Sequence, residues 1–173
     1  MGLKRVSMIG FCLAAVAAVV MLAAVIIRPP KIYISEICPS NSETSKKTAM
    51  QDKNGEPSDW IEIYNPTNKD ISLTGFSLSK NGGGDQPLGG YVIKANDYII
   101  VYCSSAGFEN ADFPHADFSI GKVSEAEIIL KYDSFQCESI KMPKLNKGVS
   151  YSKNVKGEMY VSEPTPCLLY TSD

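Results

Sequence analysis

Residues 55–79 read GEPSDWIEIYNPTNKDISLTGFSLS, and the alternation near the middle of this stretch decides the fold. Successive side chains of an extended strand point to opposite sides, so Ile61 and Ile63 share one face. Both are natural core residues, which predicts a strand with one face in a hydrophobic core. The side chains on the opposite face are those of Trp60, Glu62 and Tyr64.

Trp60 is the only tryptophan of the chain, and two arrangements of its ring are open at this point. The ring packs beneath the loop of residues 38–59, or it lies open as a contact platform with Tyr64, because exposed aromatic rings dominate interface energetics. We expect the covered arrangement. The stretch therefore specifies the fold before it indicates any chemistry.

Beyond residue 31 the apolar residues keep this two-residue period, and no helical stripe of useful length interrupts it. Short strands separated by turn residues predict an all-β, immunoglobulin-like antiparallel β-sandwich. The predicted strands are residues 32–37, 60–64, 71–73, 76–79, 91–93, 98–103, 118–120, 127–132, 137–140 and 149–152.

Turn residues separate these strands. Residues 65–68, Asn-Pro-Thr-Asn, predict a tight turn because proline presets φ, and the Asn-Gly-Gly-Gly-Asp stretch at 81–85 bends freely. Residues 95–97 lie between two β-prone runs, which predicts a hairpin. Residues 38–59 are rich in Ser, Lys, Asn and Thr, and they predict a long mobile loop.

Residues 8–27 contain no charge, amide or proline, and as a helix they are about 30 Å long, the thickness of a bilayer core. They predict a transmembrane helix after a short tail of residues 1–7. A cleaved signal peptide is the alternative, but its apolar core is usually shorter. A short tail ahead of a first membrane segment stays inside, so residues 32–166, which follow a linker of residues 28–31, lie outside the cytoplasm.

The charge balance bears on partners. Removing Lys4 and Arg5 from the 17 Lys and Arg leaves fifteen, against 19 Asp and Glu, so the part after residue 27 is acidic. This balance argues against nucleic-acid binding. An acid-free basic stretch is the exception, and it indicates either a solvated surface or weak attraction to anionic envelope polymers or lipid head groups. Its members are Lys141, Lys144, Lys147, Lys153 and Lys156.

Carboxylates give two hypotheses. Asp59 and Glu62 are close in sequence and Glu36 is expected on a neighbouring strand, but turn capping and edge solvation explain them better than acid–base catalysis. Asp52, Asn54, Glu56 and Asp59 have the alternating oxygen spacing of a calcium loop. The stretch lacks the glycine and the final glutamate of the helical calcium loop, so no cofactor is predicted and calcium stays a secondary hypothesis.

Nucleophile signatures are weak. His115 is the single histidine and has no plausible serine or cysteine partner in sequence. Ser-x-x-Lys spacings recur without the companion motifs of penicillin-binding enzymes. The cysteines Cys38, Cys103, Cys137 and Cys167 form no CxxC, which argues against zinc and leaves both free thiols and disulfides open. We therefore predict a protein that is not an enzyme.

Several segments together resemble the bacterial branch of the lamin tail domain, whose members read DWIELYN, then L-x-G-W-x-L-S, and end near PTPG. The segments that carry the resemblance are residues 32–37, 52–56, 59–65, 73–79, 90–93, 98–102, 117–120, 149–153 and 164–166. The resemblance implies an immunoglobulin-like sandwich that acts as a binding or tethering module, often beside membrane anchors or cell-surface hydrolases and kinases in bacteria.

Residues 167–173 depart from the family pattern, because cysteine rather than glycine follows Pro166. This tail resembles read-through of an adapter, and we expect the natural chain to continue differently. The leading hypothesis is a membrane-anchored, non-catalytic tethering module that contacts envelope polymers or proteins. The alternative is the anchor-proximal domain of a larger cell-surface hydrolase or kinase.

Overall fold

The computed structural model describes residues 29–41, 51–52, 55–104, 113–121 and 125–166. In these residues every regular element is a β-strand, which confirms the all-β prediction. The strands are β1 Tyr33–Cys38, β2 Asp59–Tyr64, β3 Ile71–Ser72, β4 Phe76–Lys80, β5 Gln86–Pro87, β6 Val92–Ile93, β7 Tyr98–Cys103, β8 His115–Ala116, β9 Ala126–Tyr132, β10 Phe135–Met142, β11 Ser150–Lys153 and β12 Met159–Ser162.

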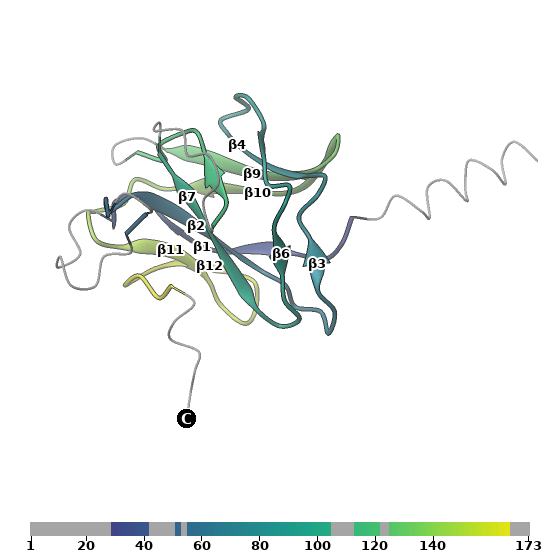
Figure 1. Cartoon of the computed structure of the whole chain (residues 1–173). Coiled ribbons are helices and arrows are strands. Elements are labelled where there is room, and N and C mark those ends of the chain that lie inside the picture. The colour runs from purple at the N-terminus through teal and green to yellow at the C-terminus, as the bar shows by residue number, and fades with distance from the viewer. Residues whose placement is uncertain (1–28, 42–50, 53–54, 105–112, 122–124, 167–173) are drawn as a thin grey trace, which may run out of the picture. The chain divides into compact units, whose positions relative to one another are not determined.

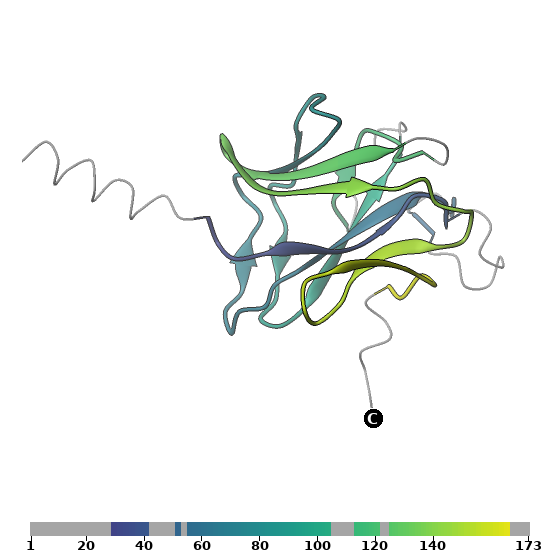
Figure 2. The same cartoon turned by 180° about the vertical axis from the view of Figure 1, so that it is seen from behind.

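Two sheets face each other. The large sheet has six strands in the order β12-β11-β1-β2-β7-β8, and the small sheet has four in the order β10-β9-β4-β5. Figure 1 and Figure 2 show β4, β9 and β10 as one layer over β1, β2 and β11, with the short pair β3-β6 at one end. Apart from the parallel contact of β7 with β8, the pairings are antiparallel. This arrangement confirms the predicted sandwich.

The core lies between the sheets. Ile61 and Ile63 of β2 are fully buried in it, as the alternation of the strand predicts. Each buried aliphatic side chain of this size stabilises the fold by about 1.5–3 kcal/mol relative to an exposed one. The small sheet contributes Phe76, Leu78, Ile128 and Leu130 to the same cluster.

Trp60 lies on the opposite face of the large sheet and is also fully buried. The register aligns it with Cys38 on one side and Tyr102 on the other, and with Ile100 these residues form a second hydrophobic cluster. The expected burial of the ring is confirmed. Trp60 therefore offers no ring surface to a partner in this structure, in contrast to its suggested role as a contact residue.

Most predicted strands are present with shifted ends, but the strand predicted at residues 118–120 is wrong. The side chain of Asp59 explains the difference, because its Oδ2 atom accepts hydrogen bonds from the backbone N–H groups of Ile120 and Gly121, at 2.9 and 3.2 Å. The Ser119 hydroxyl donates to the same oxygen at 3.0 Å. These N–H groups bind a carboxylate instead of a neighbouring strand, so the segment curls around Asp59. The strands β5, β8 and β12 were not predicted.

The hairpin predicted at residues 95–97 is also wrong. A turn is present, and Asn96 adopts a φ of 55°, which asparagine tolerates better than most residues. The flanking strands do not pair with each other, because β6 pairs with β3 while β7 pairs with β2. The turn therefore carries the chain from one sheet to another.

The proline turn after β2 is held by a buried asparagine. The side-chain NH₂ of Asn65 donates to the carbonyl oxygens of Lys69, Ile93 and Lys94, at 2.8, 3.2 and 2.9 Å. Its Oδ1 atom accepts from the N–H and the hydroxyl of Thr67, at 3.0 and 2.7 Å. One fully buried amide thus connects the end of β2 to the segment after β6.

We expect Asn65→Ala to lower the free energy of unfolding by about 2–4 kcal/mol, because it leaves buried carbonyl groups without a donor. Asn68→Ala changes an exposed residue of the same turn and should stay within about 0.5 kcal/mol. Urea unfolding followed by far-UV circular dichroism measures both. Equal effects of the two substitutions would contradict this role of Asn65.

Candidate functional site

A row of tyrosines crosses the outer face of the large sheet. Tyr33 of β1 lies opposite Tyr64 of β2, which lies opposite Tyr98 of β7. The ring centroids of Tyr33 and Tyr64 are 5.5 Å apart with the rings edge to face, and those of Tyr64 and Tyr98 are 4.4 Å apart. All three are half-buried. Tyr64, predicted as a contact residue, therefore keeps part of its ring accessible.

These tyrosines form one wall of a hollow of about 260 Å³, which we call the tyrosine groove. Tyr160 of β12 joins it from the other side and is 47% exposed. The sequence reasoning did not single out Tyr33, Tyr98 or Tyr160, because their convergence depends on the order of the strands. The groove is lined by Tyr33, Ser35, Glu36, Glu62, Tyr64, Tyr98, Ser152, Lys153, Asn154, Val155, Tyr160 and Thr165.

Two carboxylates lie at the base of the groove. Glu36 and Glu62 occupy directly opposite positions on β1 and β2, which confirms the expected placement of Glu36 on a neighbouring strand. Each is only 2% exposed. The hydroxyl of Ser35 donates to Oε1 of Glu62 at 2.6 Å. Asp59 lies three residues before Glu62 and points to the opposite face, so these two do not form a carboxylate pair.

Glu36 also holds the end of the described chain. Thr165 donates its backbone N–H to Oε1 and its hydroxyl to Oε2 of Glu36, at 2.9 and 2.8 Å. Hydrogen bonds to an ionised carboxylate are among the stronger ones in proteins. The Pro-Thr-Pro segment at residues 164–166 is therefore fixed against β1, far away in sequence.

A third glutamate joins the edge strand of the small sheet to two inner strands of the large sheet. Glu138 of β10 accepts the backbone N–H of Ile34 at 2.8 Å and forms an ion pair with Lys153 of β11. The pairing of β1 with β2 shifts register between Ile34 and Glu36. The ammonium of Lys153 also lies 4.7 Å from the ring centroid of Tyr33.

The lysines of the basic stretch at residues 141–156 do not form one continuous basic surface. Lys153 is paired with Glu138, and Lys141 lies directly opposite Glu127 on β9. The exposed Lys144 and Lys147 precede β11, whereas the exposed Lys156 follows it, so they lie at opposite ends of that strand. An acid-free segment in sequence thus acquires acidic neighbours from other strands.

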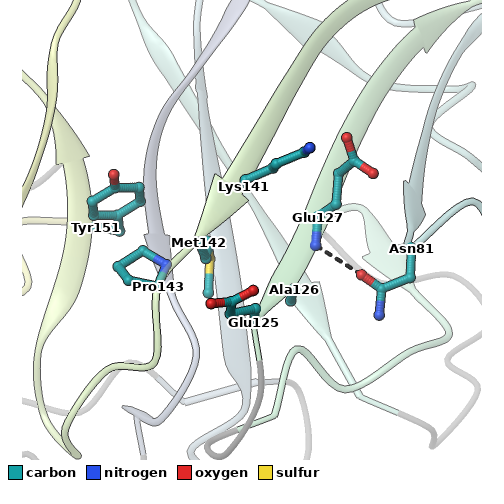
Figure 3. Close-up of a pocket in the computed structure, with 8 residues that line it drawn as sticks. All are labelled: Asn81, Glu125, Ala126, Glu127, Lys141, Met142, Pro143 and Tyr151. Carbon is teal, nitrogen blue, oxygen red and sulfur yellow. Dashed lines mark hydrogen bonds between the residues drawn. The ribbon is translucent and has the colours of Figure 1, made fainter.

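A second hollow, of about 470 Å³, lies where β9 begins and β10 ends, near β11. Figure 3 shows Met142, Pro143 and Tyr151 along one side and Asn81 on the other. Oδ1 of Asn81 accepts the backbone N–H of Glu127 at 2.8 Å. This hydrogen bond joins the residue after β4 to the start of β9, so these polar groups of the hollow serve to hold strand ends together.

The residues proposed as calcium ligands do not form a cluster in the described part of the chain. Asp52 accepts the N–H of Glu56 at 3.1 Å and the hydroxyl of Ser58 at 2.6 Å. Asp59 instead binds the segment of residues 119–121. Within the described ranges no three acidic, histidine or cysteine side chains are placed to hold a metal. Asn54 lies outside the described residues.

His115 has a serine partner that sequence reasoning missed. Oγ of Ser104 lies 2.9 Å from Nε2 of the ring, because the parallel pairing of β7 and β8 brings the two together. Burial lowers the pKa of His115, against the opposing effect of the nearby Asp117 and Asp52 carboxylates. The pair connects the end of β7 to β8, and we interpret it as a structural hydrogen bond.

The described cysteines are free thiols. Cys38 and Cys103 are buried, and Cys137 is partly buried. Burial raises the pKa of Cys38 to about 12 and that of Cys103 well above its ordinary value, so both stay protonated and unreactive near neutral pH. Cys167 lies outside the described residues, as does the predicted membrane helix of residues 8–27. No helix in the described part of the chain is long and apolar enough to span a bilayer.

A family model described as Lamin Tail Domain matches residues 28–138, which is more than half of the chain. A search of curated proteins with this chain found no match. The match ends within β10, whereas β11 and β12 beyond it complete the large sheet and supply Lys153 and Tyr160 to the groove.

We expect the fold to lose stability as the pH falls below about 6.5, the ordinary pKa of histidine, because the unfolded chain then binds a proton that folded His115 resists. The loss is complete once the pH is below the lowered pKa of the folded state. In His115→Gln this contribution is absent. Unfolding free energies of both proteins at about pH 7.5 and about pH 5 measure it, and parallel pH curves would contradict it.

Proposed function

Because the chain belongs to the lamin tail domain family, we propose that it is a non-catalytic tethering module displayed outside the cytoplasm of a bacterium on a single membrane anchor. The lamin tail domain is an immunoglobulin-like type of domain used for binding or tethering. The open tyrosine groove on a rigid sheet is the observation that favours binding here. Its half-buried rings are positioned by three paired strands and need no ordering when a partner arrives.

The anchor is supported by the sequence. Residues 8–27 have the length and composition of a membrane helix, and Arg28 with two prolines follows directly. The second of two units into which the chain divides begins at Lys31, immediately after those prolines. Display outside the cytoplasm follows from the short tail ahead of the apolar run.

The proposed absence of catalysis rests on how the candidate groups are used. Glu36 binds Thr165, Asp59 binds residues 119–121, and His115 binds Ser104. Each of these hydrogen bonds joins segments of the fold. Groups that hold the structure together in this way are poorly placed to exchange protons with a substrate.

Envelope polymers or proteins are the proposed partners. Lys144, Lys147 and Lys156 are exposed and offer weak attraction to anionic polymers. The tyrosine groove supplies the more specific surface, because aromatic rings contribute much of the binding energy of protein surfaces. Calcium is kept as a variable in the test, since Asp52 and Glu56 lie near the part of the loop that the structure leaves undescribed.

In intact bacteria we expect added protease to remove the domain of the full-length chain, because it lies outside the cytoplasm. After detergent dissolves the membrane, a tethering module should stay with the insoluble envelope fraction, with and without a calcium chelator. Immunoblotting of the fractions measures both. A domain protected from protease would contradict the proposed display, and complete release with the lipid would contradict tethering.

A control separates specific from ionic retention. Lys144→Ala combined with Lys147→Ala should weaken retention only slightly, and mainly at low salt, because exposed charges are strongly screened. Loss of retention in this variant at physiological salt would show that the basic residues, and not the tyrosine groove, hold the chain.

A further inference from the structure

We infer that the tyrosine groove binds an ammonium group carried by its partner. This inference rests on the proposed binding function and names the chemistry that the groove recognises. Four tyrosines and two carboxylates from four strands surround the same hollow. An ammonium group is attracted by both kinds of side chain, through the ring faces and through the negative charges.

The aromatic part has the required geometry. The Tyr33 and Tyr64 rings meet edge to face, whereas Tyr64 and Tyr98 are tilted by 30° at 4.4 Å. The three rings thus form a continuous wall in which electron-rich ring surface faces more than one direction. Tyr160, which is 47% exposed, stands on the far side of the groove. Because neighbouring ring centroids in the wall are only 4.4 and 5.5 Å apart, a small cation at the wall is within reach of more than one ring.

The charge of the lining favours a cation. Glu36 and Glu62 are both carboxylates, and Lys153 is the one basic side chain among the lining residues. The ammonium of Lys153 is already paired with Glu138, which lies outside the lining. The lining thus has two acidic side chains against one basic side chain, and a positively charged ligand complements this excess of negative charge.

The groove already holds one ammonium group of the protein itself. Nζ of Lys153 lies 4.7 Å from the ring centroid of Tyr33, inside the range of about 6 Å over which a cation and an aromatic ring attract each other. Tyr33 has this contact with a lysine. Among the described residues, no lysine makes such a contact with the Tyr64 ring. A ligand ammonium would occupy the corresponding position at the Tyr64 ring, above the buried Glu62.

The size of the groove indicates what carries the charge. A volume of about 260 Å³ is below the usual 300–1,000 Å³ of pockets that enclose a whole small molecule. The groove accordingly fits a head group or a single side chain. A neutral sugar would stack on the tyrosines but would bring no positive charge to the two glutamates.

The test uses the purified full-length chain and isothermal titration with choline, Nα-acetyl-lysine amide and 3,3-dimethyl-1-butanol. The last compound has the shape of choline without its charge. We expect choline or the lysine derivative to bind at least about tenfold more tightly than the neutral compound. Tighter binding of choline indicates a quaternary head group, and tighter binding of the lysine derivative indicates a protein partner. Equal affinity for choline and its neutral isostere would overturn the inference.

Substitutions locate the site. Tyr64→Leu and Glu62→Gln should each weaken binding about tenfold, and Tyr160→Leu, which changes an exposed ring, should weaken it with little risk to folding. Glu127→Gln is the matched control, because Ser139 donates to Glu127 at 2.6 Å as Ser35 does to Glu62. Thermal unfolding of every variant checks the fold. Equal effects of Glu127→Gln and Glu62→Gln would place the binding elsewhere and overturn the inference.

The two proposals fail differently. A chain that is displayed outside and retained by the envelope, yet binds no ammonium compound, contradicts only the chemistry assigned to the groove. Binding of N-acetylglucosamine but not of choline or the lysine derivative would likewise replace the ammonium group by a sugar. Ammonium binding by a chain that remains inside the cytoplasm would instead contradict the proposed display.

Discussion

Burial of both faces of β2 is the constraint on which the rest of the structure depends. Ile61 and Ile63 fill the space between the sheets, while Trp60 fills a second cluster on the outer face. A sheet with two buried faces cannot slip by one residue without exchanging every side chain between them. This fixes the register of β1 and β7 on either side of β2, and with it the tyrosine row and the opposed pair of Glu36 and Glu62.

Carboxylates hold together parts of the fold that hydrophobic packing leaves loose. Asp59 binds residues 119–121, Glu36 binds Thr165, and Glu138 joins β10 to β1 and β11. Each forms hydrogen bonds that offset the cost of removing charge from water. The candidate acidic residues are thus structural connections, and the exposed chemistry of the outer face is left mainly to tyrosines. This division is consistent with a domain that binds.

The local alternation of side chains made the sandwich, its core strands and the burial of Trp60 predictable from sequence. Long-range partners were not predictable: residues 118–120 have the apolar pattern of a strand, but the Asp59 carboxylate takes their N–H groups. Likewise, Ser104 and His115 meet only through the parallel contact of β7 with β8. Of the four tyrosines in the groove, sequence indicated Tyr64 alone, since Tyr160 reaches the groove through strand order. The short β5 and β8 are too brief for a period to be visible.

Fluorescence of the single tryptophan tests the central claim most directly, because Trp60 reports on the outer face of β2 alone. In the native chain we expect emission that is blue-shifted relative to the unfolded chain and shielded from acrylamide. On addition of urea it should shift at the same midpoint as the far-UV circular dichroism signal of the sheets. Emission and quenching typical of a water-exposed indole in the native state would contradict a strand buried on both faces.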